Sequence, residues 1–276
     1  MTVLRQPLIN TFRGWLDLNG PLLGPVLYLF EAARSYIEER VEAFDARFGT
    51  DTAAPFFGHE KKPAVHFYVA TTASLIYEIL NSLALQADTF AFVDMGSGKG
   101  RALLVASEYA FAKIVGIELS PQLHHIAEEN IKRYSPPSQQ CTVFQLHCMN
   151  VADYAYGPEP VVLFLFDPFG RETLRSVIAN LQASLSAKPR QAFVVYIYPQ
   201  FEDVLQRSPL LRKVREGGPR WRPWSRYVVY AASAPGLQAT ERRVAAKPED
   251  RTMSEADAAE DDDSRLSLPL ERGRRR

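Results

Sequence analysis

The sequence predicts an α/β protein with a doubly wound, mostly parallel seven-stranded sheet and an antiparallel last strand. Three observations support this: short apolar runs that end in acidic residues, helical repeats between those runs, and a glycine-rich turn after the first run. With 276 residues, 46% of them hydrophobic, the chain can form a sizeable core. We expect an N-terminal helical extension and loop at residues 1–63, the main domain at 64–234, and a disordered charged tail at 235–276.

The first strand–helix–strand unit of the sheet is predicted between residues 90 and 118. The apolar run 90–93 ends at Asp94, residues 101–109 repeat as a helix, and the run 114–117 ends at Glu118. Glycine permits the positive φ of a sharp turn and lets a ligand approach the backbone. The following helix N-terminus offers free N–H groups. The glycines between the first strand and the helix stand at alternate positions, Gly96, Gly98 and Gly100.

The two acids indicate which ligand the turn binds. Asp94 would repel a pyrophosphate but suits a cationic or amine-bearing ligand, and Glu118 can accept two hydrogen bonds from a ribose diol. S-adenosylmethionine has an amino group, a sulfonium and a ribose, and it has no phosphate. Residues 94–100 resemble the D/E-x-G-x-G-x-G motif of class I S-adenosylmethionine-dependent methyltransferases, with Glu118 at the second acidic position. The glycine spacing differs from G-x-G-x-x-G, which argues against a nicotinamide-dependent oxidoreductase.

This resemblance implies a set of cofactor-binding residues. In the family an Asp or Asn after the third strand binds the adenine amino group beside an apolar residue; Asn150 with Val151 takes this place here, and Asp153 is the alternative. The segment before the first strand often folds over the cofactor, so Tyr68 and Thr71 are candidate lid residues, against core packing and a solvated hydroxyl. The expected cofactor-binding residues are Asp94, Met95, Gly96, Ser97, Gly98, Gly100, Glu118, Leu119, Asn150, Val151, Asp167 and Tyr68.

The continuous apolar run 161–166 predicts a central parallel strand that is buried on both faces. The residues that follow, 167–170, resemble the D/N-P-P-Y/F motif of amino-group methyltransferases, with Phe169 in place of the second proline. The resemblance implies catalytic roles for Asp167, which would orient and deprotonate the acceptor, and for Phe169, which would wall the acceptor site. Alternatively, Asp167 caps the next helix or pairs with Arg171.

The remaining elements complete the predicted sheet and its helices. Helices are expected at 65–85, 120–134 and 171–186 and from 201, and strands at 141–148, 192–198, 210–214 and 227–231. The loop 217–224, rich in Trp and Arg, either binds substrate or is an ordinary turn. Residues 1–50 are expected to be helical and amphipathic, with apolar residues at helical spacing between 26 and 44; this segment either caps the domain or binds a membrane surface or partner.

A wider resemblance covers roughly residues 45 to 232. The stretches 92–134, 167–169 and 48–52 together are similar to an uncharacterised bacterial group of class I methyltransferases. The glycine motif of that group resembles that of the non-SET histone-lysine methyltransferases. The resemblance implies a cofactor and a reaction type, and it implies no particular substrate.

Composition narrows the remaining possibilities. The formal net charge is zero, which favours a protein or small molecule over nucleic acid as methyl acceptor. Cys141 and Cys148 form neither a disulfide framework nor a zinc site, so we expect buried or partly buried free thiols and no metal. No signal peptide or transmembrane segment is apparent, and we expect a cytoplasmic enzyme. The acceptor we expect is an amino nitrogen of a protein; an RNA methyltransferase and a non-catalytic S-adenosylmethionine-binding or scaffold protein are the alternatives.

Overall fold

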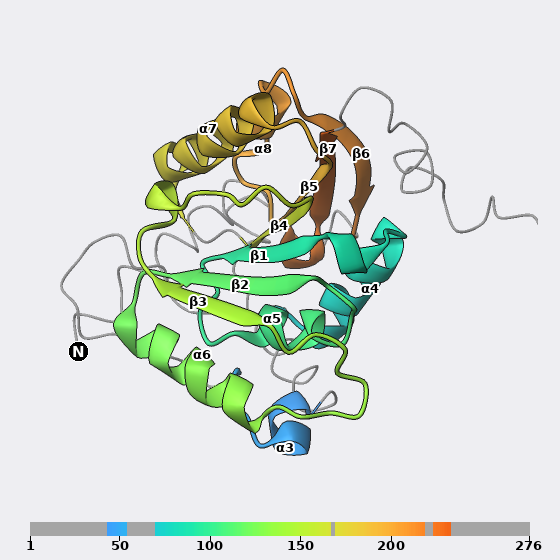
Figure 1. Ribbon diagram of the computed structural model, residues 1–276, viewed down its shortest axis with the longest axis vertical. Coiled ribbons are helices and arrows are strands. Elements are labelled where there is room, and N and C mark those ends of the chain that lie inside the picture. The colour runs from blue at the N-terminus through green and yellow to red at the C-terminus, as the bar shows by residue number, and fades with distance from the viewer. Residues whose placement is uncertain (1–42, 54–69, 167–168, 219–222, 233–276) are drawn as a thin grey trace, which may run out of the picture. The chain divides into compact units, whose positions relative to one another are not determined.

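A seven-stranded sheet forms the centre of the protein, in the order β3-β2-β1-β4-β5-β7-β6 (Figure 1). The structure is a computed structural model and describes residues 43–53, 70–166, 169–218 and 223–232. All pairings are parallel except those of β7, which runs antiparallel to β5 and β6. This confirms the predicted sheet. The strands are β1 (Ala91–Met95), β2 (Lys113–Glu118), β3 (Phe144–Cys148), β4 (Val161–Phe166), β5 (Ala192–Ile197), β6 (Arg212–Gly217) and β7 (Tyr227–Ala232).

Helices cover both faces of the sheet (Figure 1). One face packs against α4 (Ala73–Leu83), α5 (Arg101–Ala106) and α6 (Pro121–Arg133), and the other against α7 (Arg171–Ala187) and α8 (Glu202–Gln206). The short elements are α3 (Phe44–Phe48), η1 (Ala87–Thr89), η2 (Val151–Asp153) and η3 (Pro223–Ser225).

The strand β4 shows why the sheet has a core on each side. Its residues are apolar throughout and pair in register with β1 and β5. Because side chains alternate along a strand, Val162 and Phe164 join the core under α4 and α5, while Leu163 and Leu165 join the core under α7. A strand buried in this way must be apolar on both faces, as the sequence predicts.

The strand order reverses between β1 and β4, which is the topological switch point of the sheet. From β1 the chain proceeds outward through β2 to β3, and from β4 it proceeds through β5 to the opposite edge. The parallel strands end at one common edge, marked by Met95, Glu118, Cys148, Phe166 and Ile197. Ligands of open α/β sheets bind beside the carboxyl ends of strands at such a switch point. The candidate site is therefore expected next to β1 and β4.

Three elements are shorter than the sequence predicts. The helix predicted at 65–85 begins at Ala73 within the described residues, after an extended Thr72. The helix from Arg101 ends at Ala106, because the Ser107 carbonyl accepts the N–H groups of Gln140 and Cys141 at 2.8 and 2.9 Å and so cannot continue the helical hydrogen bonds. The strand predicted from Cys141 begins at Phe144, because the Cys141 N–H donates to the Ser107 carbonyl and not to a strand.

Several predictions fall on residues that are not described. They are the helix before residue 43, Tyr68, Asp167, the loop residues 219–222 and the tail from 233. The proposed boundaries 63/64 and 234/235 lie in the same gaps and stay predictions. Within the described residues, no helix combines the length and apolar character needed to cross a bilayer.

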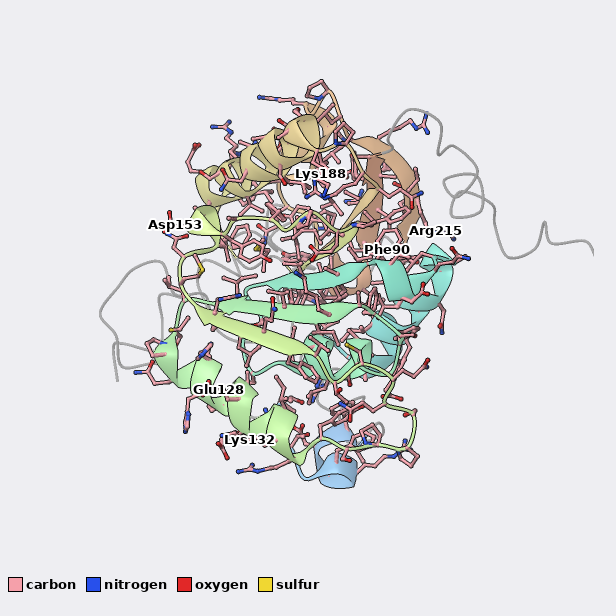
Figure 2. The ribbon with its side chains drawn as sticks, in the orientation of Figure 1. Phe90, Glu128, Lys132, Asp153, Lys188 and Arg215 are labelled. Carbon is pink, nitrogen blue, oxygen red and sulfur yellow. The ribbon has the colours of Figure 1, made fainter. Side chains whose placement is uncertain are left out.

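Glu128 and Lys132 project from the side of α6 that faces away from the sheet (Figure 2). Ser120 caps this helix and Pro121 occupies its first turn, as predicted.

Both cysteines are free. Cys141 is buried, whereas Cys148 is exposed, so the prediction that both thiols would be at least partly buried is wrong for Cys148. Cys148 is the last residue of an edge strand, which leaves its side chain open to solvent.

Candidate functional site

The glycine turn links β1 to α5 at the switch point. Gly96, Gly98 and Gly100 have φ values of +87°, +53° and +87°, which side chains rarely allow. The N–H groups of Gly96 and Ser97 donate to the Ile117 carbonyl at 2.8 and 2.9 Å, so the turn is fastened to the end of β2. This turn holds its backbone in one conformation before any ligand arrives.

Glu118 lies across the glycine turn. One oxygen of its carboxylate accepts the Gly98 N–H at 2.9 Å, and the other accepts the Ser120 N–H at 2.8 Å. The side chain is buried and comes from the last residue of β2. Its two oxygens thus lie between the turn and the start of α6, where a ribose diol could also donate to them.

Asp94 is a buried acid beside Glu118. Its side chain is 5% exposed, and burial, together with the negative charge of Glu118, raises the pKa of Asp94 to about 8. No hydrogen bond or cation from the described residues offsets this shift. A carboxyl group in this situation favours a ligand that brings a positive charge or a hydrogen-bond donor.

The other predicted cofactor residues lie along the same edge. Met95 and Ser97 are buried, whereas Leu119 is 58% exposed and presents an apolar side chain at the end of β2. The Asn150 side chain accepts the Ala152 N–H at 3.0 Å and so caps η2, and Val151 is buried behind it. Asn150 therefore has a structural role that does not depend on a ligand.

The lid and catalytic candidates are only partly described. Thr71 is buried, so it is no solvated hydroxyl. Tyr68 and Asp167 lie outside the described residues, and Asp153 is partly exposed within η2. Phe169, just before α7, packs against the core on the α7 side of the sheet. Among the described residues, Met95 and Glu118 are the last residues of β1 and β2, and Leu119 follows directly after β2.

Beside the end of β5, Tyr198 contacts Trp224 of the loop for which the sequence left substrate binding or an ordinary turn open; Tyr198 itself was not predicted as part of the site. Tyr198 has a left-handed backbone with φ +52°, and its N–H donates to the Arg226 carbonyl at 2.8 Å. Its ring is buried and lies 4.8 Å from the Trp224 ring, measured between centroids. A left-handed backbone is uncommon for a tyrosine. Where such conformations do occur, they cluster at functional sites. In the sequence, only the proline that follows Tyr198 indicates a change of backbone direction there.

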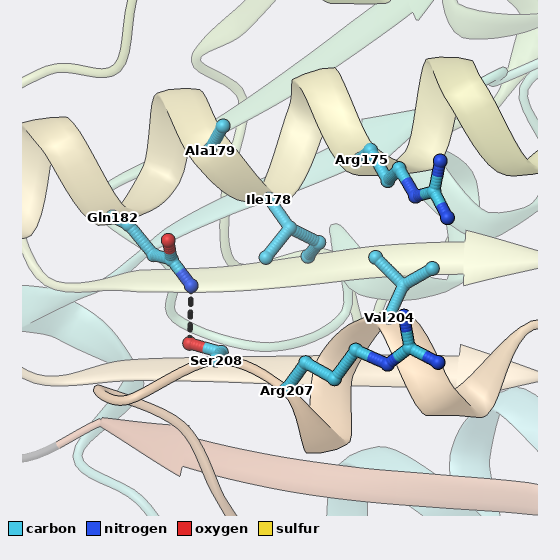
Figure 3. Close-up of a pocket in the computed structure, with 7 residues that line it drawn as sticks. All are labelled: Arg175, Ile178, Ala179, Gln182, Val204, Arg207 and Ser208. Carbon is cyan, nitrogen blue, oxygen red and sulfur yellow. Dashed lines mark hydrogen bonds between the residues drawn. The ribbon is translucent and has the colours of Figure 1, made fainter.

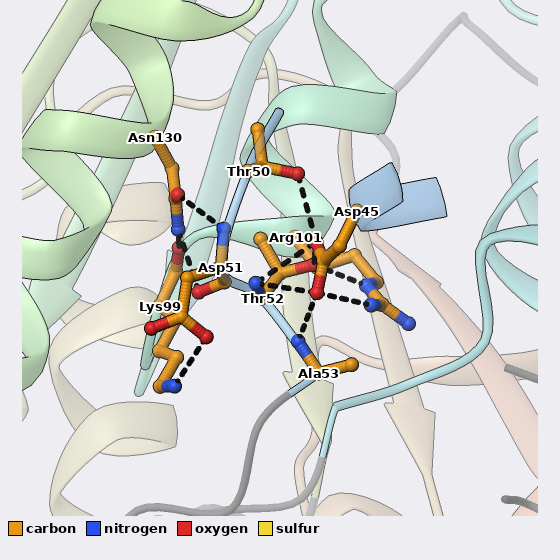
Figure 4. A network of polar contacts seen from close by, with 8 residues as sticks. All are labelled: Asp45, Thr50, Asp51, Thr52, Ala53, Lys99, Arg101 and Asn130. Carbon is orange, nitrogen blue, oxygen red and sulfur yellow. Dashed lines mark hydrogen bonds and ion pairs between the residues drawn. The ribbon is translucent and has the colours of Figure 1, made fainter. Parts of the chain in front are cut away.

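A polar network behind the turn was also not predicted. Lys99 and Arg101, on either side of Gly100, contact acidic side chains of residues 43–53 (Figure 4). One feature of the sequence could have indicated this network: Lys99 and Arg101 are cations in or next to a motif that should bind a cationic ligand, so they require nearby acids. The resemblance at 48–52 marked the segment but assigned it no role.

A hollow of about 220 Å³ between α7 and α8 lies elsewhere (Figure 3). Its two guanidinium groups already pair with acids, Arg175 with Glu172 at 2.6 Å and Arg207 with Asp203 at 3.4 Å. No predicted site residue lines it. The residues around it are Arg175, Ile178, Ala179, Gln182, Val204, Arg207 and Ser208.

The groups at the switch point suit S-adenosylmethionine better than a nucleotide with phosphates. The negative charge of Glu118 would repel a pyrophosphate, whereas the carboxyl groups of Glu118 and Asp94 can both accept hydrogen bonds from a ribose and an amino group. The strand order, the turn and the two acids are those of the class I methyltransferase fold that the sequence resembles.

Comparison with known families agrees with this geometry. The sequence model of the family described as "Histone methylation protein DOT1" matches residues 59–154, which include the turn, Glu118 and Asn150. The chain is a class I S-adenosylmethionine-dependent methyltransferase, and S-adenosylmethionine is its cofactor. A search of curated proteins finds no match.

Solved structures with a similar chain path include two methyltransferases. One is the ribosomal protein L11 methylase from Lactobacillus delbrueckii subsp. bulgaricus, with a TM-score of 0.41, 17% identity, and coverage of 59% of this chain and 79% of that chain. The other is magnesium protoporphyrin IX methyltransferase from Synechocystis PCC 6803 with bound S-adenosylmethionine, with a TM-score of 0.41, 14% identity, and coverage of 59% and 79%. At these TM-scores the two likenesses add nothing to the assignment.

Proposed function

We propose that this enzyme transfers the methyl group of S-adenosylmethionine to an amino nitrogen of a protein. The observation that carries the proposal is the match of residues 59–154 to a family whose description names histone methylation. That match spans the glycine turn and the ends of β1 and β2, the strands that contain Asp94 and Glu118. An acceptor amine would enter beside β4 and β5.

The proposed cofactor contacts follow from the positions of the groups along the strand ends. Glu118 binds the ribose diol, and Asp94 receives the amino group of the cofactor. Gly96 and Gly98 let the cofactor approach the backbone, because no Cβ occupies that space. The adenine lies near Asn150 and Val151. The complete proposed set adds Met95, Ser97, Gly100, Leu119, Asp167 and Tyr68.

The proposed chemistry requires little more than alignment by the protein. When bound, the cofactor supplies an electrophilic methyl group on a sulfonium. Orientation of reacting groups contributes up to about 7–11 kcal/mol in well-aligned systems. Asp167, which follows β4 directly, is proposed to orient the acceptor amine and to accept its proton. Within the described residues, the N-cap of α7 is Gly170, and Arg171 pairs with Asp203 at 2.6 Å, which favours this role over a purely structural one.

Aromatic rings near the end of β5 support an acceptor with an alkyl or cationic group. The rings of Tyr198 and Trp224 contact each other there, and the Arg171 guanidinium lies 4.9 Å from the ring centroid of Phe201. Phe169 adds a further ring just after the end of β4. Such rings attract an alkylammonium through their faces and exclude water from the reacting amine.

The acceptor class can be identified by transfer of a labelled methyl group. The full-length protein and labelled S-adenosylmethionine are added to a lysate of a strain that lacks the gene. We expect label in a protein band that protease removes and nuclease does not, with the methyl group on an amino nitrogen by mass spectrometry. Label confined to RNA or to a small molecule would replace the proposed acceptor. The Glu118→Ala protein is the negative control.

The role of Asp167 is testable once an acceptor is known. Asp167→Asn keeps the shape of the side chain and removes its charge. We expect turnover to fall by about 10²-fold or more, with little change in S-adenosylmethionine affinity. If Asp167 only caps α7, asparagine serves equally well and turnover stays near wild type.

A further inference from the structure

Two cations flank the last glycine of the turn, and both are buried. Lys99 is 2% exposed and Arg101 is 3% exposed. A buried cation is costly unless an opposite charge and hydrogen bonds accompany it. The same turn has to receive a cofactor that carries a sulfonium and an ammonium group, and uncompensated cations nearby would repel that cofactor.

Residues 43–53, here called the strap, supply the compensating charges (Figure 4). The Lys99 Nζ lies 2.8 Å from the Asp51 Oδ1. The Arg101 Nη2 lies 3.6 Å from the Asp45 Oδ2, and its Nε donates to the Thr52 hydroxyl at 2.7 Å. Asp51 precedes Lys99 by 48 residues and Thr52 precedes Arg101 by 49, so only the fold brings these partners together.

Asp45 also determines the conformation of the strap. Its carboxylate accepts hydrogen bonds from the Thr50 hydroxyl at 2.7 Å, from the hydroxyl and N–H of Thr52 at 2.6 and 2.8 Å, and from the Ala53 N–H at 2.7 Å. Burial opposes the ionisation of Asp45, but the bonds from Thr52, Thr50 and Ala53 together outweigh it and hold the pKa of Asp45 below its usual value. The strap therefore winds around an ionised carboxylate that faces Arg101.

Asn130 of α6 joins the strap to the turn through backbone groups. Its Oδ1 accepts the Asp51 N–H at 2.8 Å, while its Nδ2 donates to the Asp51 carbonyl at 3.0 Å and to the Lys99 carbonyl at 2.9 Å. The amide is buried. Both of its N–H donors and its oxygen are thus engaged, which fixes the separation between Asp51 and Lys99.

We propose that the strap sets the affinity of the glycine turn for its cationic cofactor, with Asp51 and Asn130 as positioning residues that act through Lys99. Asp51 neutralises Lys99 and holds its side chain away from the ligand, and Asn130 keeps both backbones in register. The inference rests on the proposed assignment of the turn as the cofactor site. It adds to that assignment a segment that precedes the first strand by about 40 residues.

The test measures binding of two ligands by calorimetry on the full chain, well below the melting temperature. S-adenosylmethionine carries the sulfonium charge, whereas its demethylated product, S-adenosylhomocysteine, is a neutral thioether at the same position. We expect Asp51→Asn to raise the Kd for S-adenosylmethionine about tenfold. The Kd for S-adenosylhomocysteine should rise only about twofold. The ratio of the two effects, about five, corresponds to about 1 kcal/mol.

A second variant separates charge from loosening of the strap. In the double variant Asp51→Asn/Lys99→Met the cation is removed together with its partner. We expect its S-adenosylmethionine affinity to return to within about threefold of wild type, since the repulsive charge is gone. Glu129→Gln is the matched control, because it breaks an ion pair of equal length, 2.8 Å to Lys132, on the exposed side of α6. It should leave both Kd values unchanged.

Two results would overturn the inference. One is a folded Asp51→Asn protein whose Kd for S-adenosylmethionine stays within twofold of wild type. The other is an equal loss for both ligands without rescue by Lys99→Met, which would indicate only a structural contact. If instead Glu118→Ala and Gly98→Ala leave the affinity unchanged, the assignment of the turn itself fails, independently of the strap.

Discussion

Asp94 shows how one buried carboxyl can link proton binding to cofactor binding. With a pKa raised to about 8, this group is mostly protonated at pH 7 in the free protein. An ammonium group beside it would favour its ionised form. We expect S-adenosylmethionine binding at pH 7 to release up to about one proton. Calorimetry in buffers with different heats of ionisation measures this number, and Asp94→Asn should abolish the release.

The same shift gives the stability of the free protein a defined pH dependence. The folded state holds the Asp94 proton up to about pH 8, whereas the unfolded chain releases it near the usual value of 3.8. Between these values the folded state binds more protons, so this group lowers the free energy of unfolding as pH rises. Asp94→Asn should flatten that decline. An unchanged pH profile would contradict the shift.

Glu118 contributes at the same scale through charge-assisted hydrogen bonds. Removal of such bonds typically costs about 1.5–3 kcal/mol, so Glu118→Ala should weaken S-adenosylmethionine binding about ten- to a hundredfold. Because Glu118 also accepts the Gly98 and Ser120 N–H groups, the melting temperature has to be measured alongside. An effect on Kd below twofold would mean that Glu118 only supports the turn.

At the scale of elements, the glycine turn depends on backbone conformations that other residues avoid. Gly98 has φ +53°, and an L-residue there costs about 1–2 kcal/mol. Gly98→Ala should lower the free energy of unfolding by this amount and weaken cofactor binding more than tenfold, because a Cβ occupies the path of the ligand. Chemical denaturation and calorimetry measure the two effects.

Gly170→Ala is the matched control for that variant. Gly170 has φ −70°, and a Cβ added there would meet nothing within 4 Å. It should leave the cofactor affinity unchanged and lower the free energy of unfolding by less than about 1 kcal/mol, because Gly170 is the N-cap of α7 and alanine is a poorer N-cap than glycine. If both variants behave alike, the turn at Gly98 has no special role.

Sequence patterns predicted the elements well where local chemistry decides them. Alternate glycines and the apolar run of β4 need no distant partner to be recognised, and both were confirmed. The ends of α5 and β3 were placed wrongly because Ser107 interacts with residues more than 30 positions away. The strap and the left-handed Tyr198 were missed for the same reason. Their conformations depend on Lys99, Asn130 and Arg226, which lie near only after folding.

At the scale of the whole molecule, the strap belongs with the domain that it contacts. Phe44 is buried in the core, and its ring stacks on that of Tyr134 with centroids 5.7 Å apart. We expect a chain that starts at residue 54 to be less stable, by about 3–5 kcal/mol, than one that starts at 43. It should also lose measurable cofactor binding. Melting temperatures within 2–4 °C of each other, the span of about 1 kcal/mol at this size, would contradict this.

We propose that the other end of the domain lies at residue 234. Apolar periodicity stops at that point, and the residues beyond it are charged and polar. A chain that ends at residue 234 should therefore keep the melting temperature and cofactor affinity of the full-length protein. A drop of more than a few degrees would show that the tail contributes to the domain.

The contacts of Asn130 impose an order of assembly on the protein. Its amide binds Asp51 across 79 residues of sequence and Lys99 across 31, so it can engage both only after β1, α5, β2 and α6 have come together. Contacts of such long range form late, because the intervening chain must close first. During synthesis, the strap is made before the strands and helices that it contacts. About 80 further residues must be translated before Asn130 is available to bind it.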